Sequence, residues 1–390
     1  MSLSSNKRAI LAKIESTYAT EAAPTSTDAI LCSNLNFTPI DGKTIDRDFI
    51  RPFLGTAGSL RVESFGKLSF NTELAGAGAG ATLSQWGALL PAANFATTSV
   101  SSSSGTCQAG SSSTTIKLAA VASSNDDVYV GAQVNTTGGT GNGQSGEIVA
   151  YNGTTKVATV RTAWATTPDA TTTYTIPAFV YALPTSVFGA ANNSSLTIYF
   201  NVDGVRHILL GCRANFGIDI ASGAIPSIKW DLIGLLGTIS DQALPTTDYT
   251  GWKTPVPALT ANTSNLTVMG YDTSLMESLS IDIGNTISHR ALIGREDILI
   301  SNRKVTAKMK IEATTLAQKN FFSALQANSF GDFYIKHGTA AGNTVCLMSP
   351  RQQLSSVNYS DSNGVQMLDI DSMLCTGSTV GNDEIRIVTR

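Results

Sequence analysis

The chain carries one pattern twice, first as Leu35-Asn36-Phe37-Thr38-Pro39-Ile40-Asp41-Gly42-Lys43-Thr44-Ile45-Asp46-Arg47, followed by Phe53-Leu54-Gly55. The second copy reads Leu279-Ser280-Ile281-Asp282-Ile283-Gly284-Asn285-Thr286-Ile287-Ser288-His289-Arg290, followed by Leu292-Ile293-Gly294. Each copy is a short alternating strand, a glycine turn, a Thr-Ile step, an arginine and an apolar-glycine end. Internal repeats set the architecture of a whole chain. The duplication therefore predicts a part that is built to repeat, and it favours architecture over chemistry.

The repeat extends beyond these two motifs in a constant order of strand, hairpin, helix, strand, strand and long hairpin. The further matched segments are Thr82–Leu90 with Thr315–Leu325, Leu196–Phe200 with Asp332–Lys336, and His207–Arg213 with Thr344–Arg351.

The spacing between the copies locates the insertions. The interval from Thr82 to Thr315 is slightly shorter than the interval from Leu35 to Leu279, so the first copy is slightly longer before its helix. The interval from Gly211 to Ser349 is much shorter again. The first copy therefore carries a long insertion between its helix and its next strand, which spans about Phe95 to Ala190.

Composition limits the class of protein. The 390 residues are 42% hydrophobic and only 14% charged, with many Ser, Thr and Gly residues, which suits β-structure rich in turns. The net charge of −3 gives no basic footprint for gripping nucleic acid. No apolar run is long enough to span a membrane, and the N-terminus lacks the apolar core of a signal peptide. The odd number of cysteines without a CxxC pair predicts reduced thiols and folding in a cytoplasm: Cys32, Cys107, Cys212, Cys346 and Cys375.

The sequence predicts a mainly β fold with two tandem cores, each with a short helix, and a small inserted all-β domain. The predicted divisions are an N-terminal arm (1–27), a first core (28–95 and 190–240), an inserted module with Ser/Thr/Gly linkers (96–189), a linker (241–265), and a second core with a C-terminal strand or arm (266–390).

Local patterns predict individual elements. The N-terminal arm holds a possible helix, Arg8–Ser16, whose apolar stripe Ile10, Leu11 and Ile14 indicates either a frayed terminus or an arm packed on a neighbouring subunit. Thr82 starts a short helix that ends before Pro91. Long hairpins are predicted at Asn215–Leu232 and Val357–Asp371, the second with an Asn-Gly turn. In the insertion, a linker at 97–115 precedes strands at Thr115–Leu118, Asp127–Val130, Gly146–Tyr151, Lys156–Val160 and Thr173–Ile176.

Catalytic, cofactor and metal motifs are absent from the sequence, so we predict no enzyme, no cofactor and no metal site. His207, His289 and His337 are scattered and are read as hydrogen-bonded strand residues. Arg47 and Arg290 recur in both copies. They form either a salt bridge inside each copy, with Asp46 or Asp48 as one possible partner, or a contact at a subunit interface.

Several of these segments resemble the major tail tube proteins of long-tailed bacteriophages: Ile10–Thr20, Leu35–Asp46, Arg51–Gly55 and Asp383–Ile387. The resemblance implies sandwich- or barrel-like cores, six of which close a ring, with rings stacked into a tube. It implies that three chains with duplicated cores can supply a ring of pseudo-six-fold symmetry. It also implies a place in the virion tail, assembly in the host cytoplasm, other tail proteins at the tube ends, and DNA that passes without specific binding.

Under this resemblance the long hairpins are candidates to line the lumen, with Asp219, Asp231, Asp369 and Asp371 facing or flanking DNA. The candidates for subunit interfaces are Ile10, Leu11, Ile14, Arg47 and Arg290. The module at 110–178 is expected on the outside, and the extra residues near Ala57–Leu74 are expected to reach the next ring. The alternative hypothesis is a tail-tip or surface adhesion protein whose inserted module recognises a receptor or carbohydrate.

Overall fold

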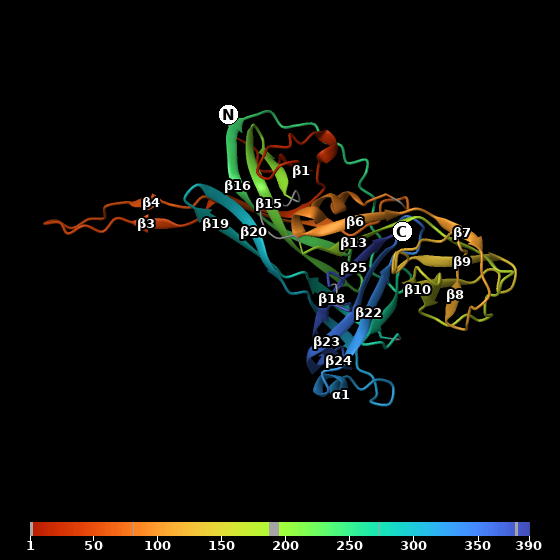
Figure 1. Ribbon diagram of the computed structural model, residues 1–390. Helices are drawn as coiled ribbons and strands as arrows, with labels where there is room; N and C mark the ends of the chain where they lie inside the picture. The colour runs from red at the N-terminus through yellow and green to blue at the C-terminus, as the bar shows by residue number, and fades with distance from the viewer. Residues whose placement is uncertain (1–2, 81, 187–194, 273, 379–380) are drawn as a thin grey trace.

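One large antiparallel sheet contains both copies of the repeat (Figure 1). The computed structural model describes residues 3–80, 82–186, 195–272, 274–378 and 381–390. In the first copy the neighbouring strands are β2 (Ser33–Asp41), β5 (Phe65–Glu73), β16 (Ser227–Asp241), β15 (Val205–Ala221), β14 (Leu196–Val202) and β1 (Arg8–Ile14).

The second copy repeats this order of neighbours. Its strands are β18 (Met276–Asp282), β21 (Thr306–Glu312), β24 (Val365–Cys375), β23 (Val345–Ser362), β22 (Phe330–His337) and β17 (Thr263–Val268). The copies join where β15 pairs with β18, in a register that sets Asp219 opposite Ser280. A single apolar cluster, which includes Phe70 and Trp230 of the first copy and Met309 and Ile370 of the second, runs beneath both.

Each copy sends out a hairpin between its first two paired strands. In the first copy this hairpin holds β3 (Thr44–Asp46) and β4 (Ser59–Arg61), and in the second it is β19 (Asn285–Leu292) with β20 (Arg295–Arg303). The first extends far from the body, whereas the second lies against the body below β15 and β16 (Figure 1). We call residues 42–62 the extended arm.

The two long hairpins form as the alternating patterns predict. In β15 and β16 the apolar Phe216, Ile218, Ile228 and Trp230 are fully buried. The turn between β23 and β24 has Asn363 at φ 53° and Gly364 at φ 83°, the pair of left-handed residues that a tight hairpin turn requires. The Asn-Gly turn predicted for the hairpin Val357–Asp371 is therefore confirmed.

The predicted N-terminal helix is wrong, because Arg8–Ile14 is the strand β1, paired along its length with β14. Ala9, Ile10, Leu11 and Ala12 are all buried, so this segment has apolar neighbours on both faces. A short continuous apolar run of this kind cannot be distinguished from a helix by periodicity alone.

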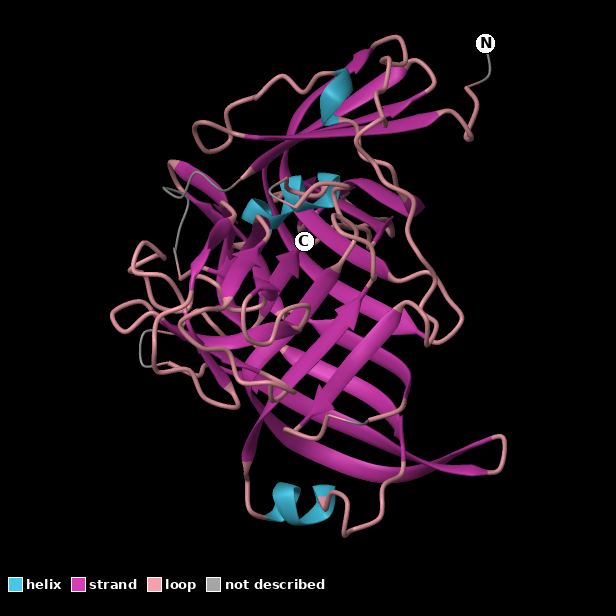
Figure 2. Cartoon of the chain, turned by 90° about the vertical axis from the view of Figure 1, so that its right-hand side faces the viewer, coloured by secondary structure: helices cyan, strands magenta, loops and turns pink. Residues whose placement is uncertain are grey.

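Helices are few and short in the described residues (Figure 2). They are the 3-10 helices η1 (Ser26–Asp28) and η2 (Gln85–Ala93) and the α-helix α1 (Phe321–Gln326). The helix predicted from Thr82 to a stop before Pro91 begins later and continues through Pro91, ending at Asn94 in the left-handed conformation. In α1, the Asn320 side chain caps the start by accepting a hydrogen bond from the Ser323 N–H, 2.9 Å away.

The insertion is less separate than its composition predicts. Its first strand β6 (Phe95–Val100) and last strand β13 (Phe179–Pro184) extend the large sheet beyond the C-terminal strand β25 (Arg386–Thr389). A second sheet contains β7 (Ser103–Thr106), β12 (Thr173–Ile176), β9 (Gln133–Gly138), β10 (Ser145–Asn152), β11 (Val157–Val160) and β8 (Thr115–Lys117).

Two predictions inside the insertion are wrong. The predicted linker at 97–115 contains β6, β7 and the start of β8, because Ser/Thr-rich segments suit exposed strand edges as well as linkers. The predicted strand at Asp127–Val130 is a turn, held by the Tyr151 N–H, which donates to the Asp127 side chain. The predicted return to the first core near residue 190 lies outside the described residues.

Candidate assembly surfaces

The four aspartates predicted to line a lumen lie on one polar face of the large sheet. Asp219, Asp369 and Asp371 line a shallow hollow of about 370 Å³ that spans β15, β18, β21 and β24. Asp231 lies on β16 beside this hollow, paired in register with Asn215 and Ser69. The structure thus brings three of the four side chains together and sets the fourth on a neighbouring strand.

Lysines interleave with these aspartates. Lys308 is the register partner of Asp371, and Lys310 is the register partner of Asp369. The hydroxyl groups of Ser356 and Ser360 donate to the carboxylates of Asp371 and Asp369, both at 2.9 Å. This part of the face therefore balances charge locally, which sequence reasoning missed because the two lysines belong to a strand that carried no predicted role.

Three of the five predicted interface residues lie on β1. Ile10 and Leu11 are buried inside their own chain, where β1 pairs with β14, so they do not form a free surface. Ile14 at the strand end is exposed. The apolar stripe therefore serves the chain's own core, apart from its last member.

The two repeated arginines lie on the two hairpins. Arg47 of the extended arm lies over the Phe49 ring, 4.8 Å from its centroid, and Arg290 on β19 faces Asp297 of β20 in register. Within the described parts of the chain neither arginine forms an ion pair with a carboxylate, so a salt bridge of Arg47 with Asp46 or Asp48 is not formed. Both arginines are at or near the molecular surface.

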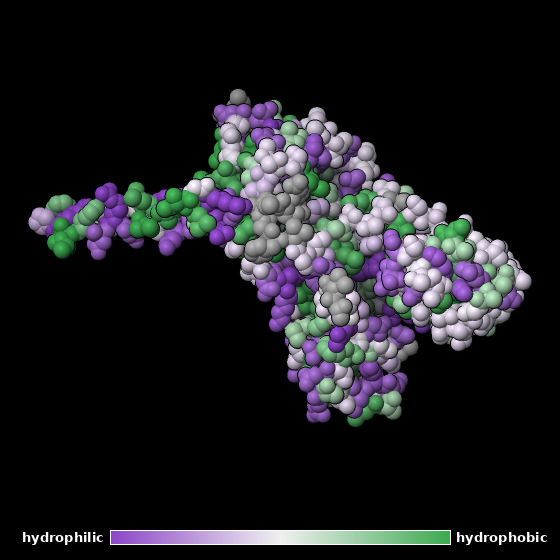
Figure 3. Space-filling view, in the orientation of Figure 1, coloured by the Kyte–Doolittle hydropathy of each residue, from purple (hydrophilic) through white to green (hydrophobic). Residues whose placement is uncertain are grey.

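The extended arm exposes large apolar side chains along most of its length (Figure 3). Ile50 and Leu54 near its tip are as exposed as in an open chain, and the other members are Ile45, Phe49, Phe53, Leu60 and Val62. Isolated surface apolar residues are ordinary, but a contiguous set marks a contact surface. In the sequence, the two apolar pairs Phe49-Ile50 and Phe53-Leu54 indicate this surface. The prediction of an interface instead chose the repeated arginine, Arg47.

The corresponding hairpin of the second copy is packed against the first copy. Ile298, Leu299 and Ile300 on β20 are buried, and the Ile298 N–H donates to the Tyr18 hydroxyl oxygen at 2.6 Å. Burial raises the pKa of Tyr18 to about 12, although the Ile298 hydrogen bond acts in the opposite direction. Within one chain, part of the β19–β20 hairpin is thus covered by the first copy, whereas the apolar side chains of the extended arm are exposed.

Two of the strand edges that are unpaired in the described chain lie at the two ends of the run of eight strands that the copies share. β2 is the end strand of the large sheet and pairs with β5 alone. The last residues of β23, Asn358–Ser362, pair with β24 on one side only, because β22 ends at the level of Gln353. Exposed edges with free N–H and C=O groups invite pairing with another strand.

The inserted module is anchored by arginines of the large sheet. The guanidinium of Arg390 donates to the Gly131 carbonyl at 3.1 Å and pairs with Glu147, while Arg386 donates to the Asp127 carbonyl at 2.9 Å. From the module, Arg161 pairs with Asp332 at 2.9 Å. The apolar core of the module is continuous with Tyr334, Met348 and Val388 of the large sheet. These contacts connect segments that are far apart in the sequence, so no local pattern could reveal them.

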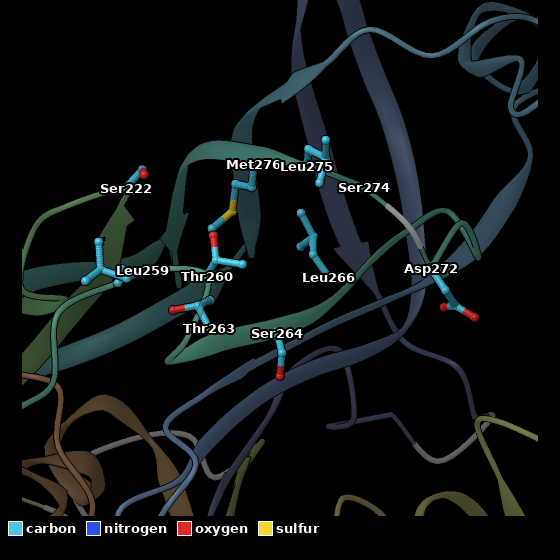
Figure 4. Close-up of a pocket in the computed structure, with 11 residues that line it drawn as sticks. Ser222, Leu259, Thr260, Thr263, Ser264, Leu266, Asp272, Ser274, Leu275 and Met276 are labelled. Atoms are coloured by element: carbon cyan, nitrogen blue, oxygen red, sulfur yellow. The ribbon is translucent and has the colours of Figure 1, made fainter.

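The pocket drawn in Figure 4 offers few groups that could take part in chemistry. It measures about 460 Å³ and is lined by hydroxyl groups, apolar side chains and one carboxylate, that of Asp272 (Figure 4). Asp272 lies 3.5 Å from the Arg161 guanidinium, which offsets its charge. Among the described residues no group of three His, Cys, Asp or Glu side chains could hold a metal ion, and no helix there is long and apolar enough to cross a membrane.

The three histidines lie on strands. The ring nitrogens of His289 and His337 contact Glu296 at 2.6 Å and Thr263 at 2.9 Å. His207 on β15 packs edge-on against the Phe37 ring, and burial lowers its pKa.

Comparison of the sequence with models of protein families gives a match over most of the chain. The family model described as phage tail tube protein matches residues 5–371, nearly the whole chain. No curated protein matches the sequence.

Proposed function

This chain belongs to the phage tail tube protein family, a structural family of the virion tail, and we propose that three copies close a ring whose stacking makes the DNA conduit. The observation that carries the proposal is the doubled strand order of the large sheet. Each copy contributes the four neighbouring strands β2, β5, β16, β15 or β18, β21, β24, β23, and the run is open along β2 at one end and along the last residues of β23 at the other. A head-to-tail contact that closes forms a ring and removes those edges.

In this proposal the first tube core comprises residues 28–95 and 190–240 together with β1, the second comprises 266–390 together with the first residues of β17, and the rest of 241–265 links them. The polar face with Asp219, Asp231, Asp369 and Asp371 faces the lumen. The inserted module faces outward, assembly occurs in the host cytoplasm, and other tail proteins cap the tube. Mixed lysine and aspartate on the lumen face supports passage of DNA, because tight binding to phosphates requires an excess of positive charge.

Electron microscopy and native mass measurement of the purified protein test this function. With eight strands from each of three chains, a spacing of ~4.8 Å and a tilt of ~40° give an inner barrel roughly 48 Å across. A single ring of three 40.8 kDa chains should weigh about 122 kDa. Isolated elongated monomers under all conditions would contradict the proposal and favour the adhesion alternative, whereas a six-chain ring would retain the tube and reject the three-chain count.

A further inference from the structure

The two copies can be superposed strand by strand through their registers. In the first copy one row of cross-strand partners reads Asn36, Ser69, Asp231 and Asn215. In the second copy the row reads Ser280, Lys308, Asp371 and Ser356. Asn36 and Ser280 are the second residues of the two repeated motifs, so the two rows are structurally equivalent.

The contact between the copies has a definite stagger. Along β15, the residue four positions after Asn215 is Asp219, and it pairs with Ser280, the first residue of the second row. Gly217 likewise pairs with Asp282, and Ile218 pairs with Ile281. Both isoleucines are completely buried. The pairing of Asp219 with Ser280 therefore fixes the register between the last strand of the first core and the first strand of the second.

We infer that the free end of β23 pairs with β2 of a second copy in this same stagger. Four positions after Ser356 is Ser360, which is placed opposite Asn36 of the second copy, and Asn358 is placed opposite Thr38. The partner is a second copy, because the contact continues the internal one and both required edges are unpaired in the described chain. This register rests on the proposed ring and assigns its subunit contact.

The side chains at this contact suit burial. Tyr359 takes the place of Ile218 and Phe37 takes the place of Ile281, so that two aromatic rings meet on the apolar side of the sheet. Tyr359 is 62% exposed in the single chain, where it touches only the Phe322 ring among aromatic side chains of the described residues, at 5.2 Å. Paired aromatic residues of neighbouring strands stabilise a sheet.

One backbone bond differs between the internal contact and the proposed one. The Ile283 N–H donates to the Phe216 carbonyl at 3.1 Å, and Pro39 occupies the equivalent place in the first copy. Proline has no N–H, so this bond cannot form between chains. The contact between chains therefore ends at Thr38, one hydrogen bond shorter than the contact within a chain.

Paired cysteines test the register. In a background with Cys32→Ser and Cys375→Ser, which removes the two thiols that are not buried, we would oxidise assembled Ser360→Cys/Asn36→Cys and Asn358→Cys/Thr38→Cys proteins. Asp219→Cys/Ser280→Cys reports the same geometry inside one chain, and Ser360→Cys/Thr38→Cys is the off-register control. We expect covalent chains up to three copies long, at least tenfold more abundant from the in-register pairs than from the control.

The same preparations, viewed by electron microscopy, separate the register from the function. Rings or tubes without in-register cross-links would overturn the inference and leave the tube. In-register cross-links in open chains that never close would support the inference and contradict the proposed ring. Equal cross-linking of the in-register and off-register pairs would also overturn the inference, and circular dichroism of each variant checks folding.

Discussion

The Tyr18 hydroxyl group makes one of the contacts that hold the second copy's hairpin against the first copy. The Tyr18 hydroxyl oxygen accepts a hydrogen bond from the N–H of Ile298, which is buried. A buried N–H without a hydrogen-bond partner lowers the stability of the folded protein. Tyr18→Phe should therefore lower the free energy of unfolding by about 1–3 kcal/mol in urea denaturation. The matched control is Tyr249→Phe, whose hydroxyl has no hydrogen-bond partner among the described residues.

The same residue predicts a response to alkaline pH. Because folding raises the pKa of Tyr18 from 10 to about 12, its contribution is fully present below pH 10 and is lost as the pH rises towards 12. The wild type should lose more stability than Tyr18→Phe between these values. Equal losses in the two proteins would show that Tyr18 is not buried against β20.

At the scale of elements, the extended arm is the clearest contact surface. Ile50→Ser with Leu54→Ser should change monomer stability by less than about 0.5 kcal/mol, because both side chains are fully exposed. Assembly should require at least tenfold more protein, because we propose that a second copy covers the arm, as the first copy covers Ile298–Ile300 of the β19–β20 hairpin. Light scattering against concentration would measure this.

Val121→Ser is the control for the arm, since Val121 is an exposed apolar residue on the inserted module, away from the proposed contacts. Unchanged assembly of the arm variant would contradict a role between copies.

Turn chemistry made some elements predictable, and long-range contacts made others unpredictable. Asn363-Gly364 specifies its hairpin locally, and the repeated motif correctly predicted the first strand of each copy's sheet, β2 in the first copy and β18 in the second. The strand β1 could not be predicted from its own residues, because it forms by pairing with β14, which lies in a distant part of the sequence. The anchoring of the module by Arg386 and Arg390 could not be predicted either, because it depends on the folded sheet. The four aspartates could be placed on one face by alternation, but their lysine neighbours could not.

For the whole molecule, the proposed lumen predicts a charge effect on DNA. Asp369→Asn with Asp371→Asn removes two negative charges beside Lys308 and Lys310, although Lys310 keeps its ion pair with Glu277 at 3.3 Å. Tubes of this variant should retain short duplex DNA at low salt and release it as salt rises, because phosphate contacts weaken with salt. Co-sedimentation with labelled DNA would measure retention.

The charge-matched control adds two positive charges on exposed residues of the inserted module, Asn142→Lys and Thr154→Lys. Equal retention by this control would show that net charge, and not the polar sheet face, governs DNA contact. No retention by either variant would remove these aspartates from the lumen.

The pairing of β15 with β18 has a consequence for how an assembly forms. In a ring of six cores, every second contact already exists when a chain has folded, so its effective concentration does not depend on the supply of protein. Only the alternate contacts must form by diffusion. The two kinds of contact are then free to evolve apart, and a module carried by one core of each pair decorates the outside with three-fold spacing.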